Sequence, residues 1–386
     1  MSGAAPAPDV VVVGAGIAGA ACAYELSGAG LSVTVLDRGA VAAGTTGAGE
    51  GNILVSDKLP GPELELALLS HRLWRELPEQ IAAAAELEGK GGLVVAGDPA
   101  ALDGLRTLAA DHAAAGVRSA SVAGGSLREL EPEIAADLPG GIVYPDDMQV
   151  QPMLAAAHLL AAARARGAEV RFGEPVTAIR RRGDRVTGVA TPAGEIPAGA
   201  VVNATGVWAS QTAALAGVSV PILPRRGFIL VTEPLGPVIR HKVYDASYVA
   251  NVVSSAEGLE SSAVVEGTPS GTVLIGASRE RVGFERTIST PLLARLARQA
   301  IRLFPMLERV RAIRAYRGFR PYSPDHLPVI GPDPRAPGLL HACGHEGAGI
   351  GLAPATGRLI AECVTGRTPS VPLAPFAPER LDEAPS

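Results

Sequence analysis

Three glycines near the start of the chain have the spacing of a nucleotide-binding turn. Four valines at 10–13 predict a buried strand, and Gly14, Gly16 and Gly19 follow it as G-x-G-x-x-G. The first glycine allows the sharp turn, the second lets a pyrophosphate approach the backbone, and the third lets the next helix pack closely. Asp37 ends a second predicted strand over 32–36, where a carboxylate accepts hydrogen bonds from an adenosine ribose. The pattern predicts a dinucleotide site, and a tight turn without a ligand is the alternative.

A second glycine-rich helix start lies at 344–351, Gly-His-Glu-Gly-Ala-Gly-Ile-Gly. Reduction of a flavin places negative charge on its N1–C2=O edge, and the positive end of a helix stabilises that charge. A nicotinamide dehydrogenase does not usually need this second helix start, so the pattern favours a flavin. Glycines that only cap the helix are the alternative. An NAD(P)-dependent dehydrogenase is the rival enzyme, because Arg38 after Asp37 could bind a ribose 2′-phosphate.

The elements that must position these motifs alternate between helices and strands, which predicts an α/β protein with a Rossmann-like domain and a second, mixed-sheet α+β domain. The predicted helices are 63–85, 99–115, 152–166, 290–304 and one from the terminal glycines to about 365. The predicted strands are 92–96, 169–172, 175–181, 185–190, a strand from 200 that runs into a glycine turn, 222–233, 248–253, 261–266, 272–276 and 311–320. The three strands between 169 and 190 suggest a small meander.

Composition limits the classes of protein and partner. A length of 386 residues predicts two domains, and a net charge of −5 with a pI near 5.9 argues against nucleic acid and anionic membranes. Cys22, Cys343 and Cys363 are too few and too scattered for a disulfide framework or a zinc site, and we expect no metal at His341, Cys343 and His345. The N-terminus lacks signal-peptide features and no apolar run could span a bilayer, so we expect a soluble, cytoplasmic protein.

Four stretches, in this order, resemble the D-amino-acid oxidase superfamily of FAD enzymes. They are the turn at 14–19, Val-Asn-Ala-Thr-Gly-Val-Trp at 202–208, Gly-Phe-Arg-Pro-Tyr-Ser-Pro-Asp at 318–325, and the glycine-rich stretch at 344–351. That superfamily includes glycine and sarcosine oxidases, D-amino-acid dehydrogenases, and the flavin subunits of hydroxyproline and opine dehydrogenases and cyanide synthase. Residues 44–52 and 344–352 are most similar to the last of these groups.

The resemblance implies an FAD-binding domain made of 1–85, 148–220 and 320–380, and a substrate-binding domain made of 86–147 and 221–319. It also implies hydride transfer to flavin N5 from the carbon beside a neutral amine, giving an imine that water hydrolyses. The expected substrate is an amino acid or an N-substituted amino acid, such as glycine, a D-amino acid, sarcosine or a D-hydroxyproline-like compound. Expected partners are this small molecule and either further copies of the chain or subunits with further redox centres. A non-catalytic electron-relay subunit is the alternative function.

Specific site residues follow from the motifs and the resemblance. Arg320 is expected to clamp a substrate carboxylate, because a guanidinium offers two parallel charge-assisted hydrogen bonds, and an ion pair with Asp325 or Glu346 is the alternative. Tyr244 and Tyr248 are expected to face the substrate from a sheet. The residues expected to contact the cofactor are Gly14, Gly16, Ile17, Ala18, Gly19, Asp37, Arg38, Thr45, Thr46, Gly49, Gly51, Asn52, Val176, Ala204, Thr205, Gly206, Trp208, Gly344, His345, Glu346, Gly347, Gly349 and Ile350.

Two further expectations concern the flavin. Monomeric sarcosine oxidases carry the flavin on a cysteine, and the matching position here is Arg320, so we expect non-covalent FAD. These oxidases also activate oxygen with a lysine, and the matching position is Leu274. A cation at that place stabilises developing superoxide. The resemblance therefore favours a dehydrogenase or a slow oxidase.

Overall fold

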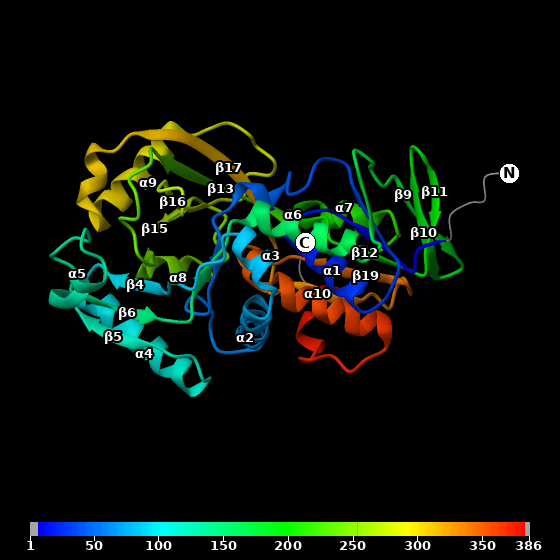
Figure 1. Ribbon diagram of the computed structural model, residues 1–386, viewed down its shortest axis with the longest axis horizontal. Helices are drawn as coiled ribbons and strands as arrows, with labels where there is room; N and C mark the ends of the chain where they lie inside the picture. Colours follow the sequence, from blue (N-terminus) through cyan, green and yellow to red (C-terminus); the bar gives the residue numbers. More distant parts are fainter. Residues whose placement is uncertain (1–6, 253, 383–386) are drawn as a thin grey trace.

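The computed structural model describes residues 7–252 and 254–382, which form two lobes, each built on one large sheet (Figure 1). The first lobe holds a six-stranded sheet in the order β18-β19-β12-β1-β2-β8. Its strands are β1 (Val10–Val13), β2 (Val33–Asp37), β8 (Glu169–Phe172), β12 (Ala200–Asn203), β18 (Val329–Pro332) and β19 (Leu339–Cys343). Neighbouring strands are parallel except β18, which runs antiparallel to β19.

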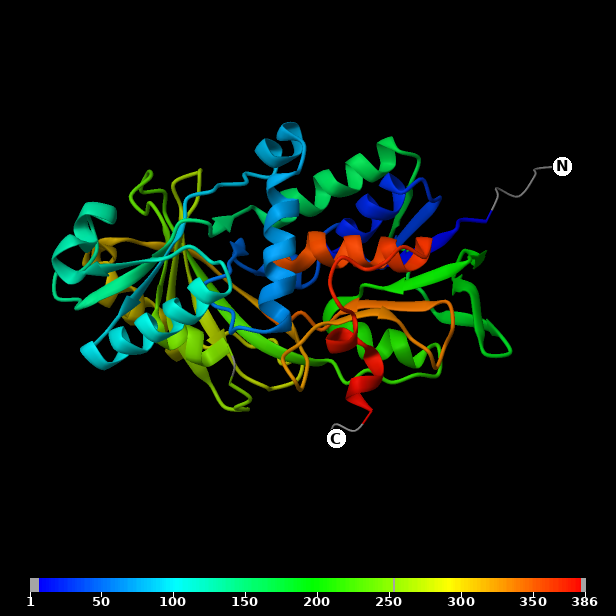
Figure 2. The same cartoon turned by 90° about the horizontal axis from the view of Figure 1, so that it is seen from below.

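Successive valines of β1 serve opposite faces of this sheet, because side chains alternate along a strand. Val10 and Val12 join the apolar core beneath three helices, α1 (Ile17–Gly28), α6 (Pro152–Ala165) and α10 (Gly349–Thr365), which form one layer (Figure 2). Val11 and Val13 join a second core with the small sheet β9 (Ala178–Arg182), β10 (Arg185–Thr191) and β11 (Gly194–Pro197). The first strand is therefore buried on both faces, as in other parallel sheets.

Two glycines let the first helix pack unusually closely. A Cβ on Gly19 would lie 1.9 Å from the carbonyl oxygen of Gly14, and one on Gly357 would lie 2.5 Å from that of Ala21. Neither space admits a side chain, so α1 lies directly against the turn that precedes it and against α10. These contacts fix the positions of both helix N-termini relative to the sheet.

The second lobe holds an eight-stranded sheet in the order β17-β13-β16-β15-β14-β4-β6-β5. Its strands are β4 (Gly92–Ala96), β5 (Ala120–Ala123), β6 (Gly140–Tyr144), β13 (Leu223–Thr232), β14 (Lys242–Asp245), β15 (Glu260–Gly267), β16 (Val273–Arg279) and β17 (Ala312–Tyr322). The helix α9 (Thr290–Leu303) buries Leu292, Leu296 and Leu303 in the core of this lobe. The other elements are α2 (Pro62–Arg75), α3 (Glu79–Ala84), α4 (Pro99–Ala114), α5 (Leu127–Leu130), α7 (Ala209–Ala214), α8 (Ala246–Val252), β3 (Asn52–Ile53) and β7 (Met148–Gln149).

The strands of the six-stranded sheet lie within 10–37, 169–203 and 329–343, and those of the eight-stranded sheet lie within 92–144 and 223–322. Three predicted elements are wrong in detail. The strand predicted at 248–253 is the helix α8 over its described residues, and the Asp245 carboxylate accepts the backbone N–H of Ser247 at 2.8 Å, which favours a helix start. The predicted helix 63–85 is two helices, because Pro78 adopts an extended conformation between them. The strand 169–172 belongs to the large sheet and not to the meander, which is β9-β10-β11.

Among the described residues, every helix is too short or too polar to cross a lipid bilayer.

Candidate active site

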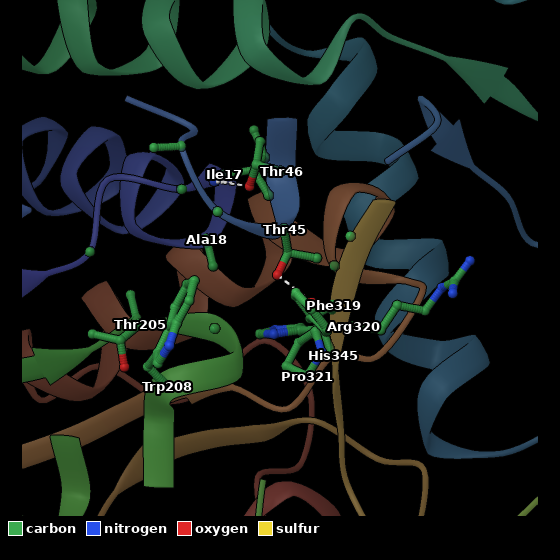
Figure 3. A pocket seen from close by; sticks show the side chains of 18 of the residues that line it. Ile17, Ala18, Thr45, Thr46, Thr205, Trp208, Phe319, Arg320, Pro321 and His345 are labelled. Atoms are coloured by element: carbon green, nitrogen blue, oxygen red, sulfur yellow. Dashed lines mark hydrogen bonds between the residues drawn. The ribbon is translucent and has the colours of Figure 1, made fainter. Parts of the chain in front are cut away.

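A cavity of about 620 Å³ lies between the two lobes, and segments far apart in the sequence line it (Figure 3). One side carries the start of α1, with Ile17 and Ala18, and the loop with Thr45 and Thr46. The other side carries the end of β17, with Phe319 and Arg320, and the start of α10. The Thr45 hydroxyl donates to the carbonyl oxygen of Phe319 at 2.7 Å, which joins the two sides.

Backbone groups shape the cavity where β1 meets α1. Gly14 has a φ of +111°, and a Cβ there would lie 2.5 Å from the carbonyl oxygen of Ala204. Gly16 is the N-cap of α1, and the Ile17 N–H donates to the Thr46 hydroxyl at 3.0 Å. A helix start with a glycine cap exposes N–H groups and the positive end of the helix dipole, which suits an anion.

The Asp37 carboxylate lines the same part of the cavity and is held in place by two backbone donors. Its oxygens accept the N–H groups of Ala15 and Gly39, each at 2.7 Å. A carboxylate offers about four lone-pair sites, so it can still accept hydrogen bonds from a ligand hydroxyl. Val176 lines the neighbouring wall.

Trp208 and Arg38 form one wall of the cavity together. The Arg38 guanidinium lies 4.1 Å from the centre of the Trp208 ring, which is a cation–π contact. Both residues line the cavity, as do Ala204, Thr205 and Gly206, which follow β12. Trp208 also stacks on Phe284, with ring centres 5.9 Å apart.

The start of α10 carries a buried histidine and a buried ion pair. Burial lowers the pKa of His345 to about 4, so its imidazole is neutral at pH 7, and Nε2 bonds the Thr356 hydroxyl at 2.9 Å. Burial alone raises the pKa of Glu346, but the hydrogen bond from His326 (2.9 Å) and the charge of Arg225 bring it below its usual value. Gly347, Gly349 and Ile350 also line the cavity.

Arg320 lines the cavity without a carboxylate partner among the described residues. Its Nη1 donates to the carbonyl oxygen of Ser278 at 2.7 Å. The two acids that offered an alternative role bind elsewhere: Asp325 pairs with Arg380 at 2.6 Å, and Glu346 pairs with Arg225 and His326. Arg320 is therefore available to a ligand carboxylate.

The two predicted tyrosines differ. Tyr248 lines the cavity from the helix α8, and not from a sheet. Tyr244 does not line it, which contradicts the expectation that it faces the substrate: the side chain is fully buried, and its hydroxyl bonds the Ser56 hydroxyl, which donates to Asp147. The two rings nevertheless meet edge to face, with their centres 5.3 Å apart.

Three of the predicted glycines also lie outside the cavity lining, because each meets the backbone or core of the protein. Gly19 packs on Gly14, as described above. A Cβ on Gly51 would lie 1.8 Å from the Val150 carbonyl oxygen, and Gly344 has a φ of +75° beside Ile222. The other predicted cofactor residues all line the cavity: Gly14, Gly16, Ile17, Ala18, Asp37, Arg38, Thr45, Thr46, Gly49, Asn52, Val176, Ala204, Thr205, Gly206, Trp208, His345, Glu346, Gly347, Gly349 and Ile350.

Sequence reasoning missed two acidic residues of the lining, Glu174 and Glu50, and Glu50 is 7% exposed. The carboxylate of Glu50 has charged neighbours. It lies 4.0 Å from the Lys242 amine, and Lys242 also pairs with Glu266. The available signal was an acid between glycines at 49 and 51 in a stretch otherwise rich in small residues.

The histidine and cysteine cluster at 341–345 is divided among separate partners. His341 contacts Asp333 at 3.0 Å, His345 contacts Thr356, and Cys343 is buried. Within the described residues, His, Cys, Asp and Glu side chains form no group of three that could hold a metal ion.

Known proteins share this fold and sequence pattern. A family model described as FAD dependent oxidoreductase matches residues 9–363. The hydrogen cyanide synthase subunit HcnC of Pseudomonas aeruginosa is 30% identical, with 98% of this chain and 97% of that protein covered. The crystal structure of glycine oxidase from Geobacillus kaustophilus superposes with a TM-score of 0.87 at 28% identity, covering 97% of this chain and 98% of that one. The crystal structure of L-proline dehydrogenase from P. horikoshii has a TM-score of 0.89 and covers 98% and 99%, but its 23% identity shows the fold alone.

These matches confirm the resemblance and the mixed α/β fold. They assign the chain to a family of FAD-dependent enzymes and not to the NAD(P)-dependent dehydrogenases. The glycine turn at α1, the aligned Asp37 carboxylate and the second helix start at α10 are what an FAD-sized ligand requires of the cavity. The chain belongs to the DAO family of FAD-dependent oxidoreductases.

Proposed function

We propose that this enzyme holds FAD non-covalently and oxidises the C–N bond of an amino acid or N-substituted amino acid. Asp37 would bind the adenosine ribose, and Gly14, Gly16 and Thr46 would surround the pyrophosphate at the start of α1. The start of α10 would face the flavin ring. When bound, FAD supplies the two-electron acceptor, and the residues of the chain bind and orient the substrate beside it.

The position of Arg320 in the cavity is the main support for the proposal. Arg320 lies in the cavity wall, half-buried, and the two acids expected as alternative partners, Asp325 and Glu346, pair with other residues. A guanidinium in this state binds a carboxylate with two parallel hydrogen bonds, which fixes the orientation of the ligand. Orientation matters here because hydride transfer requires the reacting C–H bond to lie close to its acceptor.

The relatives support an amino acid as the substrate. Glycine oxidase and sarcosine dehydrogenase are named for amino-acid substrates, and they share 29% and 30% of their aligned residues with this chain. The choice among glycine, sarcosine, D-amino acids and D-hydroxyproline-like compounds rests on a substrate screen.

The screen tests the proposed function directly. The purified, yellow protein is mixed without oxygen with glycine, sarcosine, D-alanine, D-proline, L-proline and iminodiacetate, and the flavin absorbance is followed. Bleaching by one or more of them is expected. A colourless protein that binds NAD(P), or a flavin that none of these compounds reduces, contradicts the proposal.

Non-covalent attachment has a simple test. Cys22, Cys343 and Cys363 all lie outside the cavity lining, so a thioether to FAD at the lining has no cysteine to form it. Acid precipitation should leave the yellow chromophore in the supernatant. Flavin that stays with the pellet contradicts this part of the proposal.

The acceptor that reoxidises FAD is proposed to be a carrier other than oxygen, or oxygen only slowly. Leu274 does not line the cavity, and Lys242, the cation near the lining, is paired with carboxylates. Peroxide release at the same rate as dye reduction would contradict this proposal.

An electron-relay subunit is the second candidate, because HcnC is named as a subunit. Bleaching of the flavin by any amine excludes an inert scaffold, while co-purification of a second redox protein supports the hetero-oligomer.

A further inference from the structure

We propose that Glu50 is a catalytic base of this cavity, which takes a proton from the ammonium group of the substrate. The inference rests on the proposed function, since it names the residue that prepares an amino acid for oxidation. Amino acids carry an ammonium group at neutral pH, whereas hydride transfer needs the nitrogen lone pair. A group in the cavity that accepts this proton allows the ammonium form, which predominates at neutral pH, to react.

The surroundings of Glu50 show a carboxylate prepared for a ligand. The side chain lines the cavity together with Arg320 and Tyr248, and only 7% of its surface is exposed. Among the described residues, Oε1 has no hydrogen-bond partner, although it is buried. A buried acceptor without a hydrogen bond carries a free-energy cost, which is larger for a charged group. A ligand N–H in the cavity would remove this cost.

The neighbouring carboxylate differs from Glu50 in just this respect. Glu266 pairs with the buried amine of Lys242 and accepts the Gly51 N–H at 3.1 Å. Lys242 lies 4.0 Å from the other oxygen of Glu50, which is beyond hydrogen-bond distance. One carboxylate of the cluster is satisfied inside the protein, and the other has an oxygen left for a ligand.

Burial of Glu50 favours proton uptake, and the charged groups around it modify this effect. Lys242, Glu266, Arg320, Tyr248 and Tyr316 are the charged and titratable groups that face it. Burial, with a smaller contribution from Glu266, raises the pKa of Glu50, against the opposite effect of Lys242 and Arg320. A carboxyl with a raised pKa is a stronger base near neutral pH.

The proton transfer balances without any further reactant. One N–H bond of the substrate ammonium breaks, an O–H bond forms on Glu50, and the electron pair stays on nitrogen. Before the transfer, Arg320 at the carboxylate and Glu50 at the ammonium group give the cavity complementary charges for the two ends of an α-amino acid. This arrangement selects zwitterions over simple amines and simple acids.

A matched pair of probes tests the inference. Sarcosine and methoxyacetate have nearly the same shape, but only sarcosine carries an ammonium group. Their dissociation constants are measured without oxygen from the perturbation of the flavin spectrum, or from the concentration dependence of bleaching if sarcosine reduces the flavin. Glu50→Gln should raise the dissociation constant of sarcosine at least tenfold at pH 7 and change that of methoxyacetate less than threefold. In this variant, the rate of bleaching by a reducing substrate should rise about tenfold for each unit of increasing pH, because the fraction of free amine rises.

Glu131→Gln is the control, because Glu131 is a fully buried carboxylate outside the cavity lining that accepts the N–H groups of Arg240 and His241. It should leave the preference for sarcosine over methoxyacetate unchanged. Equal weakening of both probes by Glu50→Gln, or a loss of bleaching that pH does not restore, would overturn the role of Glu50. Failure of the wild-type flavin to respond to either probe or to any amino acid would instead overturn the proposed function.

Discussion

The two ends of the cavity differ in the groups that line them, which are mainly backbone groups at one end and side chains at the other. At the start of α1, backbone N–H groups, glycines and one carboxylate held by backbone donors form the wall. At the end of β17, single side chains such as Glu50, Tyr248 and Arg320 form it. The first end depends on a local chain conformation, whereas the second depends on tertiary packing. Substitutions should therefore affect cofactor binding at the first end and turnover at the second.

The largest effect is expected from Gly14→Ala at the backbone end. The φ of +111° and the 2.5 Å separation from the Ala204 oxygen leave no room for a methyl group, so β1 and β12 must move apart. We expect the purified variant to lose FAD and its cooperative thermal unfolding. Gly30→Ala is the control, because Gly30 also has a positive φ, +86°, but has open space around it. It should be destabilised by about 1 kcal/mol and keep FAD. A yellow, stable Gly14→Ala protein would contradict the comparison.

Arg320→Leu should produce the largest effect at the side-chain end. Loss of a bidentate clamp on a carboxylate lowers kcat/KM by about 100-fold, with KM raised and kcat lowered. Arg320→Lys should recover only part of this loss, because an ammonium cannot form the two parallel hydrogen bonds. The absorbance of bound flavin checks that FAD stays in place. Normal turnover of a carboxylate substrate by Arg320→Leu would remove the main support for an amino-acid substrate.

Acid should destabilise the protein through His345 at the start of α10. Its pKa is about 4 in the folded protein, against 6.5 when unfolded. Between these values the unfolded state binds more protons, so the free energy of unfolding falls as the pH falls from 6.5 toward 4. The loss is on the order of 3 kcal/mol. Urea denaturation at several pH values in this range measures the free energy of unfolding. Its slope against pH should be smaller for His345→Gln than for the wild type. The slope that remains includes His71, whose pKa is also lowered to about 4 by burial, and Asp147, whose pKa burial raises to about 7 and which acts in the opposite sense. An unchanged slope would show that His345 is not buried neutral.

The smallest effect is expected from Asp37→Ala. The variant loses the acceptor for a ribose hydroxyl and for two backbone N–H groups, so FAD should bind about tenfold more weakly. Titration of the apoprotein with FAD, followed by flavin fluorescence, measures this change. Asp9→Ala is the control, since Asp9 also accepts a backbone N–H, that of Ser32, but lies outside the cavity lining. Equal weakening by both variants would point to a general loss of stability.

The same comparison explains how much the sequence could predict. Gly14, Gly16 and Asp37 belong to one short strand-turn-helix pattern, so their positions in the cavity follow from local conformation. Helices and strands with strong apolar periodicity, such as 99–115 and 222–233, lie close to the predicted bounds. The family resemblance, not periodicity, selected Arg320.

Other features depend on contacts that a sequence pattern does not contain. Glu50 gains its character from Lys242 and Glu266, which are about 200 residues away in the chain. Tyr244 is removed from the cavity by its hydrogen bond to Ser56. Residues 248–253 alternate like a strand, but the backbone N–H of Ser247 donates to the Asp245 carboxylate at the start of the helix Ala246–Val252.

The close packing of α1 on α10 has a consequence for biosynthesis. The helix α1 meets α10, and the strand β12 beside β1 meets its second neighbour β19, only when the last part of the chain has left the ribosome. At an elongation rate of about 5–20 residues per second, the valines of β1 wait roughly 20 to 60 seconds for a complete sheet. During that interval the nascent chain exposes an apolar strand with an unpaired edge. Production of this enzyme should therefore depend on chaperones that hold the N-terminal segment, and truncation before 365 should yield aggregates instead of a smaller folded protein.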